Sequence, residues 1–195
     1  MRPRACTDSQ RAFSIVCPVG PLASARATLS ATVAVLLLAI MCILGGRSAA
    51  AATSEPLTFP TERGPLVVTT LGHASLMFKW NGEVIYVDPV SAQADFNLLP
   101  DADQIWITHD HGDHLDPKAI AQIRTGATQI VADTHSAAKL GAGVIALHNG
   151  EQTTIGGVTI QAVPAYNLVR GPSAAQKYHR KGWYNGYIAD FGGFR

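Results

Sequence analysis

The segment THDHGDH, residues 108–114, places three histidines and two aspartates within seven positions. The whole chain has seven histidines, so this density argues against a chance arrangement. Neutral imidazole and carboxylate groups are the usual ligands of Zn²⁺, and of iron or manganese at sites built from nitrogen and oxygen. Gly112 allows the chain to turn around an ion with no Cβ in the way. A polar surface loop is the alternative, and the clustering favours a metal site.

The preceding residues indicate how this segment is displayed. QIWIT, residues 104–108, is a short apolar strand that runs directly into it, so the histidines lie where a strand ends. His109 and His111 are two residues apart and can point the same way from extended backbone. The side chains are therefore expected at the edge of a sheet, where they are exposed.

Further elements are predicted on both sides of this segment. Asn81-Gly82 between two apolar runs is a strong hairpin signal, since both residues tolerate the positive φ of a type I′ turn. Asp116 suits a helix N-cap, Pro117 the first helical position and Gly126 the end of that helix. Strands are predicted at 66–72, 75–80, 83–88, 104–108, 128–133, 143–147 and 186–191, with a short helix at 134–141 capped by Thr134 and a hairpin at 153–165 turning on Gly156-Gly157. This succession predicts an α/β or α+β layered domain with a mixed sheet.

Length and composition limit the classes of protein. At 195 residues the chain is one domain, or one domain with an appendage. Its three cysteines, Cys6, Cys17 and Cys42, all precede residue 50, which excludes a disulfide or a thiolate metal site in the remainder. Residues 51–195 carry ten Lys/Arg and thirteen Asp/Glu with no basic run. A mildly acidic domain of this kind is a poor nucleic-acid binder, so no nucleic-acid partner is expected.

The N-terminal region is typical of an export signal. An arginine-bearing segment precedes the apolar run ATVAVLLLAIMCILGG, residues 31–46, and the small-residue stretch SAAAAT follows. The apolar run is shorter than the ~20 residues of a spanning helix. We therefore expect a signal peptide over 1–52, a linker over 53–65, and an exported protein with no stable membrane span after cleavage. An uncleaved membrane anchor is the alternative.

Two longer stretches carry a family resemblance. THDHGDHLD matches the H-x-H-x-D-H signature of the metallo-β-lactamase superfamily. LGHASLMFKWNGEVIYVDPV resembles the G-H-A hairpin and D-P ending of one branch, which includes L-ascorbate-6-phosphate lactonase-like proteins and the phospholipase D that acts on N-acyl phosphatidylethanolamines. The resemblance covers about residues 66–195. It implies a four-layer αββα sandwich with the metals at one edge of its two sheets.

The resemblance also implies a chemistry. His109 and His111 would bind a first metal, and Asp113 and His114 would bind a second. Asp113 is also the expected catalytic residue. The cofactors would be two divalent ions, zinc first, with iron or manganese as alternatives. Such a pair lowers the pKa of a shared water, and the resulting hydroxide attacks a carbonyl or phosphoryl centre. The expected function is an exported metal-dependent hydrolase of a phosphodiester, lactone or related ester, acting on a small-molecule or lipid-like substrate.

Other residues remain open at this stage. Asn167, in AVPAYN, stands where the family often has a metal-binding histidine. His179 is a candidate substitute ligand or a substrate-binding residue, and the alternative is a basic surface loop over Lys177–Lys181. His73 could orient a ligand through a hydrogen bond, or simply end a strand. Asp88 could hold the metal loop from behind, or form a turn.

The C-terminal end leads to a further expectation. In the family, a G-D-T-like segment follows the strand predicted at 186–191, and its aspartate bridges both metals. This sequence ends at FGGFR. We therefore expect only the N-terminal half to two-thirds of the sandwich within residues 66–195, a C-terminally incomplete domain. The alternative function is a truncated metal-binding remnant that is inactive or non-catalytic.

Overall fold

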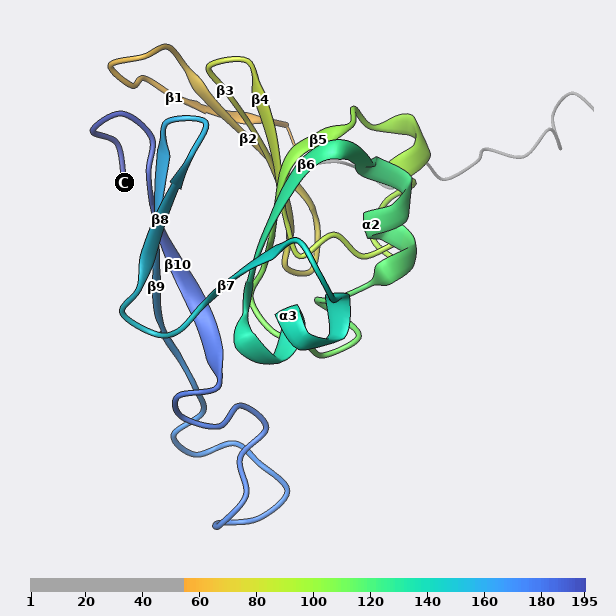
Figure 1. Ribbon diagram of the computed structural model, residues 1–195, viewed down its shortest axis with the longest axis vertical. Coiled ribbons are helices and arrows are strands. Elements are labelled where there is room, and N and C mark those ends of the chain that lie inside the picture. Colours follow the sequence, from red (N-terminus) through yellow and green to blue (C-terminus); the bar gives the residue numbers. More distant parts are fainter. Residues whose placement is uncertain (1–54) are drawn as a thin grey trace, which may run out of the picture. The chain divides into compact units, whose positions relative to one another are not determined.

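This computed structural model describes residues 55–195 of the chain. These residues form two β-sheets and one layer of short helices (Figure 1). The signal peptide predicted at 1–52 lies outside the described residues. No helix within 55–195 is long and apolar enough to cross a membrane.

The larger sheet has seven strands, and they lie in space in the order of the sequence. β1 to β4 are antiparallel neighbours, whereas β4 to β7 are parallel, so the predicted mixed sheet is confirmed. The strands are β1 (Leu57–Phe59), β2 (Leu66–Gly72), β3 (Ser75–Trp80), β4 (Glu83–Val87), β5 (Ala102–Ile107), β6 (Arg124–Asp133) and β7 (Val144–Leu147). β1 falls within the segment 53–65 predicted as a linker. It instead extends the sheet, with Leu57 opposite Val68 of β2.

The smaller sheet is antiparallel and has three strands in the order β10-β9-β8. These are β8 (Gln152–Ile155), β9 (Val158–Ala165) and β10 (Tyr184–Asp190). Gly156 and Gly157 turn the β8–β9 hairpin with φ of 56° and 86°, and Asn81 and Gly82 turn the β3–β4 hairpin with φ of 49° and 86°. Both predicted hairpins are confirmed, because a tight turn of this hand requires two residues at positive φ.

The helical layer comprises η1 (Phe96–Leu98), α2 (Pro117–Ile123) and α3 (Thr134–Leu140). Asp116 caps α2 and Pro117 opens it, as predicted. The helix ends at Ile123 and not at Gly126, because β6 begins directly at Arg124. The cap of α3 is Asp133 and not Thr134: one Asp133 carboxylate oxygen accepts hydrogen bonds from two successive backbone amides of the first turn.

Strand β5 explains how the layers join. Ile105 and Ile107 face the helices, whereas Gln104 and Trp106 face the smaller sheet, as the alternation of a strand requires. The apolar run in QIWIT is therefore buried on both faces. The core between the sheets contains Trp80, Trp106, Val158, Ile160 and Phe191, and the core under the helices contains Tyr86, Phe96, Ile105, Ile120 and Ile123. All helical segments within 55–195 lie on one side of the larger sheet, so these residues form three layers of the predicted αββα sandwich.

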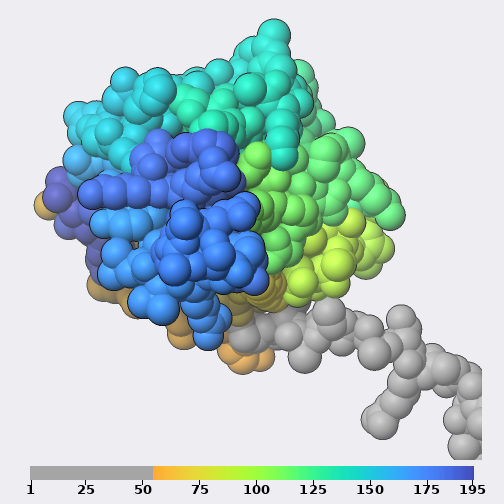
Figure 2. Space-filling view, turned by 90° about the horizontal axis from the view of Figure 1, so that it is seen from below, coloured from red at the N-terminus to blue at the C-terminus, as the bar shows by residue number. Residues whose placement is uncertain are grey.

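Strand β10 is attached to the larger sheet by buried polar contacts. The Asn185 side chain donates to the carbonyl of Leu147 at 2.9 Å and accepts from Asn149 at 2.7 Å. The Asn185 backbone amide donates to the carbonyl of Thr108 at 3.1 Å. The Tyr187 hydroxyl donates to the carbonyl of Ile107 at 2.7 Å. β10 is therefore held against the end of β5, and the connection that precedes it, residues 166–183, projects towards the viewer in Figure 2.

Replacing Asn185 tests this attachment. Asn185→Ala leaves the buried Leu147 carbonyl without its side-chain donor and removes one of the two acceptors of the Asn149 amide, which keeps the Tyr184 carbonyl. We therefore expect the free energy of unfolding to fall by about 1–3 kcal/mol. Asn97→Ala is the matched control, since Asn97 is exposed on η1, and should change it by no more than about 0.5 kcal/mol. Denaturant unfolding measures both variants. Equal stabilities would contradict the assigned role of Asn185.

Candidate metal centre

The THDHGDH segment forms a tight turn over the end of β5. Its shape comes from hydrogen bonds that the His111 carbonyl accepts from the backbone amides of His114 at 3.0 Å and Leu115 at 2.8 Å. Leu115 is buried in the core under the helices and secures the far end of the turn. The turn therefore places the three histidine side chains at the sheet edge, as predicted, but His109 is buried there and is not exposed.

Four imidazoles gather there, and we refer to His109, His111, His114 and His179 as the imidazole cluster. The ring centroid of His109 lies 4.7 Å from that of His111, 3.9 Å from that of His114 and 4.6 Å from that of His179. His179 arrives from the loop between β9 and β10, on the smaller sheet. The nitrogen atoms of His109, His111 and His179 that can bind a metal lie within 4.8 Å of one another.

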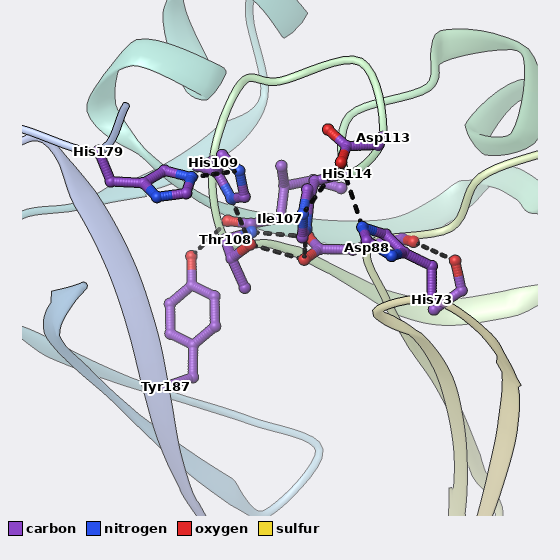
Figure 3. Close-up of polar contacts among 10 residues, drawn as sticks. His73, Asp88, Ile107, Thr108, His109, Asp113, His114, His179 and Tyr187 are labelled. Carbon is purple, nitrogen blue, oxygen red and sulfur yellow. Dashed lines mark hydrogen bonds and ion pairs between the residues drawn. The ribbon is translucent and has the colours of Figure 1, made fainter. Parts of the chain in front are cut away.

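Asp88 and Thr108 determine which nitrogen of two cluster histidines carries the proton (Figure 3). His114 Nδ1 lies 2.8 Å from Asp88 Oδ2, which can only accept, so Nδ1 donates. The Thr108 hydroxyl donates its own proton to Asp88 Oδ2 at 2.6 Å. It therefore accepts from His109 Nδ1, 2.9 Å away. In the neutral form of both rings, Nε2 is therefore the unprotonated nitrogen and is available for a metal.

Asn167 does the same for His179. The amide oxygen of Asn167 lies 2.8 Å from His179 Nδ1 and 2.9 Å from the His179 backbone nitrogen, and it accepts from both. That oxygen is therefore occupied by His179, and Asn167 stands behind the histidine. His179 therefore lies inside the imidazole cluster, where it can act as a substitute ligand, and is not merely part of a basic surface loop.

The free nitrogens of His109 and His179 face each other. Their Nε2 atoms are 3.1 Å apart, and each carries a lone pair because each ring holds its proton on Nδ1. Two facing lone pairs repel unless a cation lies between them. Two nitrogens bound to one tetrahedral zinc ion at 2.0–2.1 Å would lie about 3.3 Å apart. The donor set therefore fits a metal ion.

His73 and Asp113 form the exposed side of the centre. His73 Nε2 lies 3.1 Å from Asp113 Oδ2, and the ligand atoms of this pair and of His114 all lie within 4.8 Å of one another. Burial acts to raise the pKa of the Asp113 carboxyl, but a backbone hydrogen bond, the His114 charge and the His73 contact outweigh it and hold that pKa below its ordinary value. Asp113 is therefore ionised at neutral pH.

Asp110 and Tyr184 occupy the opposite side. The Asp110 carboxylate pairs with Lys139 Nζ of α3 at 2.7 Å. The Tyr184 ring lies 5.3 Å from the His109 ring and 5.6 Å from the His111 and His179 rings, measured between centroids. Burial, followed by the Asp110 carboxylate, raises the pKa of Tyr184 to about 12, so Tyr184 stays protonated.

Thr108 is the residue of this centre whose role the sequence did not indicate. A threonine at the end of a strand is common, and nothing in its spacing separates a ligand-orienting hydroxyl from an ordinary strand end. Its role depends on Asp88, which is twenty positions away and reaches it through the parallel pairing of β4 with β5.

A cavity of about 350 Å³ opens beside the cluster. This volume lies within the range of small-molecule sites. Its walls include Asp88, Thr108, His109, His114, Tyr166, Asn167, His179, Tyr184 and Asn185. A second cavity of about 380 Å³ lies between the sheets, and its walls are mainly aliphatic and aromatic, so the candidate metal centre belongs to the first.

Removing the charge of Asp88 tests the anchoring of the cluster. Asp88 has φ of 44°, a conformation that asparagine also tolerates, so Asp88→Asn preserves the backbone. Its amide nitrogen must replace either Oδ1, which accepts from the Thr108 backbone amide, or Oδ2, which accepts from the Thr108 hydroxyl and His114 Nδ1, so either orientation loses an anchor. We expect zinc affinity, measured by competition with a chelating dye, to fall about 10–100-fold.

The control for this variant is Asp95→Asn, because Asp95 caps the exposed η1 segment and asparagine caps as well as aspartate. Its zinc affinity should match the wild type. Equal affinities for all three proteins would show that Asp88 does not orient the ligands.

The pKa of His109 predicts a pH dependence. Burial, followed by the charges of His114, His179 and His111, lowers the pKa of His109 from 6.5 to about 3. Between these values the unfolded chain binds the proton and the folded protein does not, so folding stability is lost as pH falls below 6.5. The stability difference between metal-free wild type and His109→Gln should shrink by up to about 1.4 kcal/mol per pH unit on acidification. Urea unfolding from pH 7 to pH 5 measures it, and a constant difference would contradict a neutral His109.

Comparison with known proteins identifies the family and the fold of this chain. The family model of the beta-lactamase superfamily domain matches residues 67–195. A crystal structure from Parabacteroides distasonis ATCC 8503, described as that of a candidate metal-dependent hydrolase, is 45% identical with a TM-score of 0.64, over 70% of this chain and 61% of that chain. Igni18, described as a novel metallo hydrolase from the archaeon Ignicoccus hospitalis KIN4/I, is similar in fold, with a TM-score of 0.50 and 22% identity over 66% of this chain and 57% of that chain.

Among curated proteins, Protein Rv0786c of Mycobacterium tuberculosis (strain ATCC 25618 / H37Rv) is 28% identical over 107 residues, which are 54% of this chain and 50% of that protein. The chain thus spans half of the curated relative's length and 61% of the Parabacteroides protein's length. The family match covers most of the chain and includes the whole THDHGDH segment. This chain therefore belongs to the β-lactamase superfamily, in the metallo-β-lactamase group that its H-x-H-x-D-H segment predicted.

Proposed function

We propose that this chain is a metal-dependent hydrolase that holds two divalent metal ions. The observation that carries the proposal is the 3.1 Å approach of His109 Nε2 and His179 Nε2, each on a ring whose Nδ1 proton is already committed. An arrangement in which acceptors converge is stabilised by a cation and is unfavourable without one. The description of the Parabacteroides relative as a candidate metal-dependent hydrolase supports the same proposal.

The ligands divide into two groups. We assign His109, His111 and His179 to a first ion, and Asp113 and His114 to a second. When bound, such ions lower the pKa of a water molecule and polarise the oxygen of an ester. Zinc suits the imidazole-rich first group, and iron or manganese are alternatives for the same nitrogen and oxygen donors.

The surrounding residues have supporting roles in this proposal. Asp88 and Asn167 hold His114 and His179 through Nδ1, so that each ring presents Nε2 to an ion. His73 donates its Nε2 proton to Asp113 and keeps the Asp113 carboxylate at the open side of the centre. Asp113 is the proposed catalytic residue, since it is ionised, exposed and itself a member of the second ligand group.

The proposed substrate is a phosphodiester, a lactone or a related ester, either a small molecule or lipid-like. The G-H-A hairpin and D-P ending of residues 71–90 support this class over β-lactams, because they resemble the lactonase and phospholipase branch. The basic, apolar and small-residue order of residues 1–52 supports export of the mature protein.

Metal content and turnover, measured together, test the proposal. The purified wild type should hold metal stoichiometrically by mass spectrometry and hydrolyse bis(p-nitrophenyl) phosphate or a simple lactone. The double variant His109→Ala/His111→Ala should lose metal affinity by more than about 100-fold, since loss of an outer partner alone costs up to that much. His148→Ala is the matched control, because His148 is exposed on a turn away from the cluster.

The outcomes separate the two candidate functions. Stoichiometric metal with turnover that both disappear in the double variant supports the hydrolase. Stoichiometric metal with no turnover on any ester favours a non-catalytic metal-binding protein. Unchanged metal content in the double variant would overturn the assigned centre.

A further inference from the structure

The loop between β9 and β10, residues 166–183, carries most of the exposed large apolar side chains within residues 55–195. Leu168 and Val169 are 77% and 83% exposed. Five of the eight exposed large hydrophobic residues within 55–195 belong to it: Tyr166, Leu168, Val169, Tyr178 and Trp183. Isolated exposed apolar residues are ordinary, but a contiguous group marks an interaction site.

The same loop carries a concentrated positive charge. Its cations are Arg170, Lys177, Arg180 and Lys181, and no acidic residue occurs between Glu151 and Asp190. The rest of residues 55–195 has six Lys/Arg against thirteen Asp/Glu. The loop is therefore a positive, apolar projection from an acidic body, and its partner must be both anionic and apolar.

The base of the loop is fixed to the metal centre. Trp183 stacks on His135 of α3 with ring centroids 4.2 Å apart. The Arg180 guanidinium lies over the Trp183 ring, 4.6 Å from its centroid. Asn167 and His179, which lie in the loop, bind each other and bring His179 Nε2 to His109. The base of the loop therefore also lines the cavity beside the imidazole cluster, through Tyr166, Asn167 and His179.

We propose that the 166–183 loop docks on an anionic phospholipid surface and presents the metal centre to the headgroup esters of that surface. Exposed aliphatic and aromatic side chains enter the boundary between headgroups and acyl chains, while Lys and Arg are attracted by the anionic headgroups. The acidic remainder of residues 55–195 is repelled, which orients the loop towards the lipid. The substrate class, an ester of an anionic lipid, rests on the hydrolase function proposed above.

Other partners match the loop less well. A second copy of this chain would set the two positive loops against each other if they meet on the symmetry axis. If each loop meets the acidic body of the other copy, it finds only three large exposed apolar residues there within 55–195, Leu57, Leu98 and Ile188. A nucleic acid offers phosphates but no apolar phase for Leu168 and Val169, the most exposed apolar side chains of the loop. An anionic lipid surface supplies both components at once.

A tryptophan reporter tests the docking directly. Trp80 and Trp106 are each 1% exposed, so with Trp183→Phe the full chain has little lipid-accessible tryptophan in residues 55–195. In this background, Val169→Trp places a reporter at the loop, and Leu98→Trp places one at a comparably exposed apolar residue on η1. Each protein is mixed with brominated phosphatidylglycerol vesicles and with brominated phosphatidylcholine vesicles.

The expected result is specific to one reporter and one lipid. Phosphatidylglycerol should quench the emission of the Val169→Trp protein roughly two-fold or more, with a blue shift, and leave the Leu98→Trp protein unchanged. Residues 1–54 contain the apolar run 31–46, which could bring the whole chain to a vesicle, and the paired reporters in one full chain separate that event from docking of the loop. Equal quenching of both reporters, or of neither, would overturn the proposal.

Charge variants provide the second measurement. Arg170→Gln/Arg180→Gln/Lys181→Gln should weaken docking of the Val169→Trp reporter about 100-fold, which corresponds to roughly 1 kcal/mol for each charge. The matched control, Lys79→Gln/Lys118→Gln/Arg124→Gln, removes three exposed cations elsewhere and should not weaken it.

Two further outcomes are decisive. A blue shift that follows protein concentration without lipid, together with dimers in sedimentation velocity, would replace the lipid with a second copy. The vesicle measurement requires no turnover, so a loss of hydrolase function leaves it readable: docking without turnover would overturn the proposed function alone, and turnover without docking would overturn this inference alone.

Discussion

The candidate metal centre depends on the hydrogen bonds that the Asp88 carboxylate accepts. It is buried, and it accepts from the Thr108 amide at 2.8 Å, the Thr108 hydroxyl at 2.6 Å and His114 Nδ1 at 2.8 Å. A buried carboxylate is tolerated only when such donors surround it. The hydrogen bonds that satisfy the Asp88 carboxylate also determine which histidine nitrogens are protonated. Asp88 fixes the proton of His114 on Nδ1 directly, and it fixes that of His109 on Nδ1 through the Thr108 hydroxyl.

The centre is divided between the two sheets. The THDHGDH turn ends a parallel strand of the larger sheet, whereas His179 comes from the loop that leads into β10 of the smaller one. Asn185 and Tyr187 attach β10 to the end of β5 through buried hydrogen bonds. The geometry of the cluster is therefore a consequence of how the two sheets pack against each other. If the 166–183 loop docks on lipid, the same attachment transmits its position to the metal ligands.

Much of the fold could be predicted because its signals are local. Strand boundaries followed the apolar alternation, and both hairpins followed residue pairs that adopt positive φ without strain. The errors were local conflicts that packing resolved. Residues 57–59 look like linker but gain hydrogen bonds from β2. Helix α2 stops before Gly126 because Arg124 already pairs with Ala102 of β5, and this parallel pairing resumes at Gln129. The cap of α3 moved by one residue because a carboxylate can accept from two amides at once.

The sequence alone determined the identity of the three clustered histidines and of Asp113, because H-x-H-x-D-H is a short-range pattern and a turn after a strand must bring its members together. It also determined the family, and the mixed sheet through local periodicity. Only the tertiary structure decided that His179 meets His109 across seventy positions, and that Asn167 stands behind His179. It likewise decided that the Thr108 hydroxyl connects Asp88 to His109 by donating to the first and accepting from the second. These contacts depend on the pairing of distant strands and on the packing of one sheet against another, and no spacing along the chain encodes the distance between two sheets.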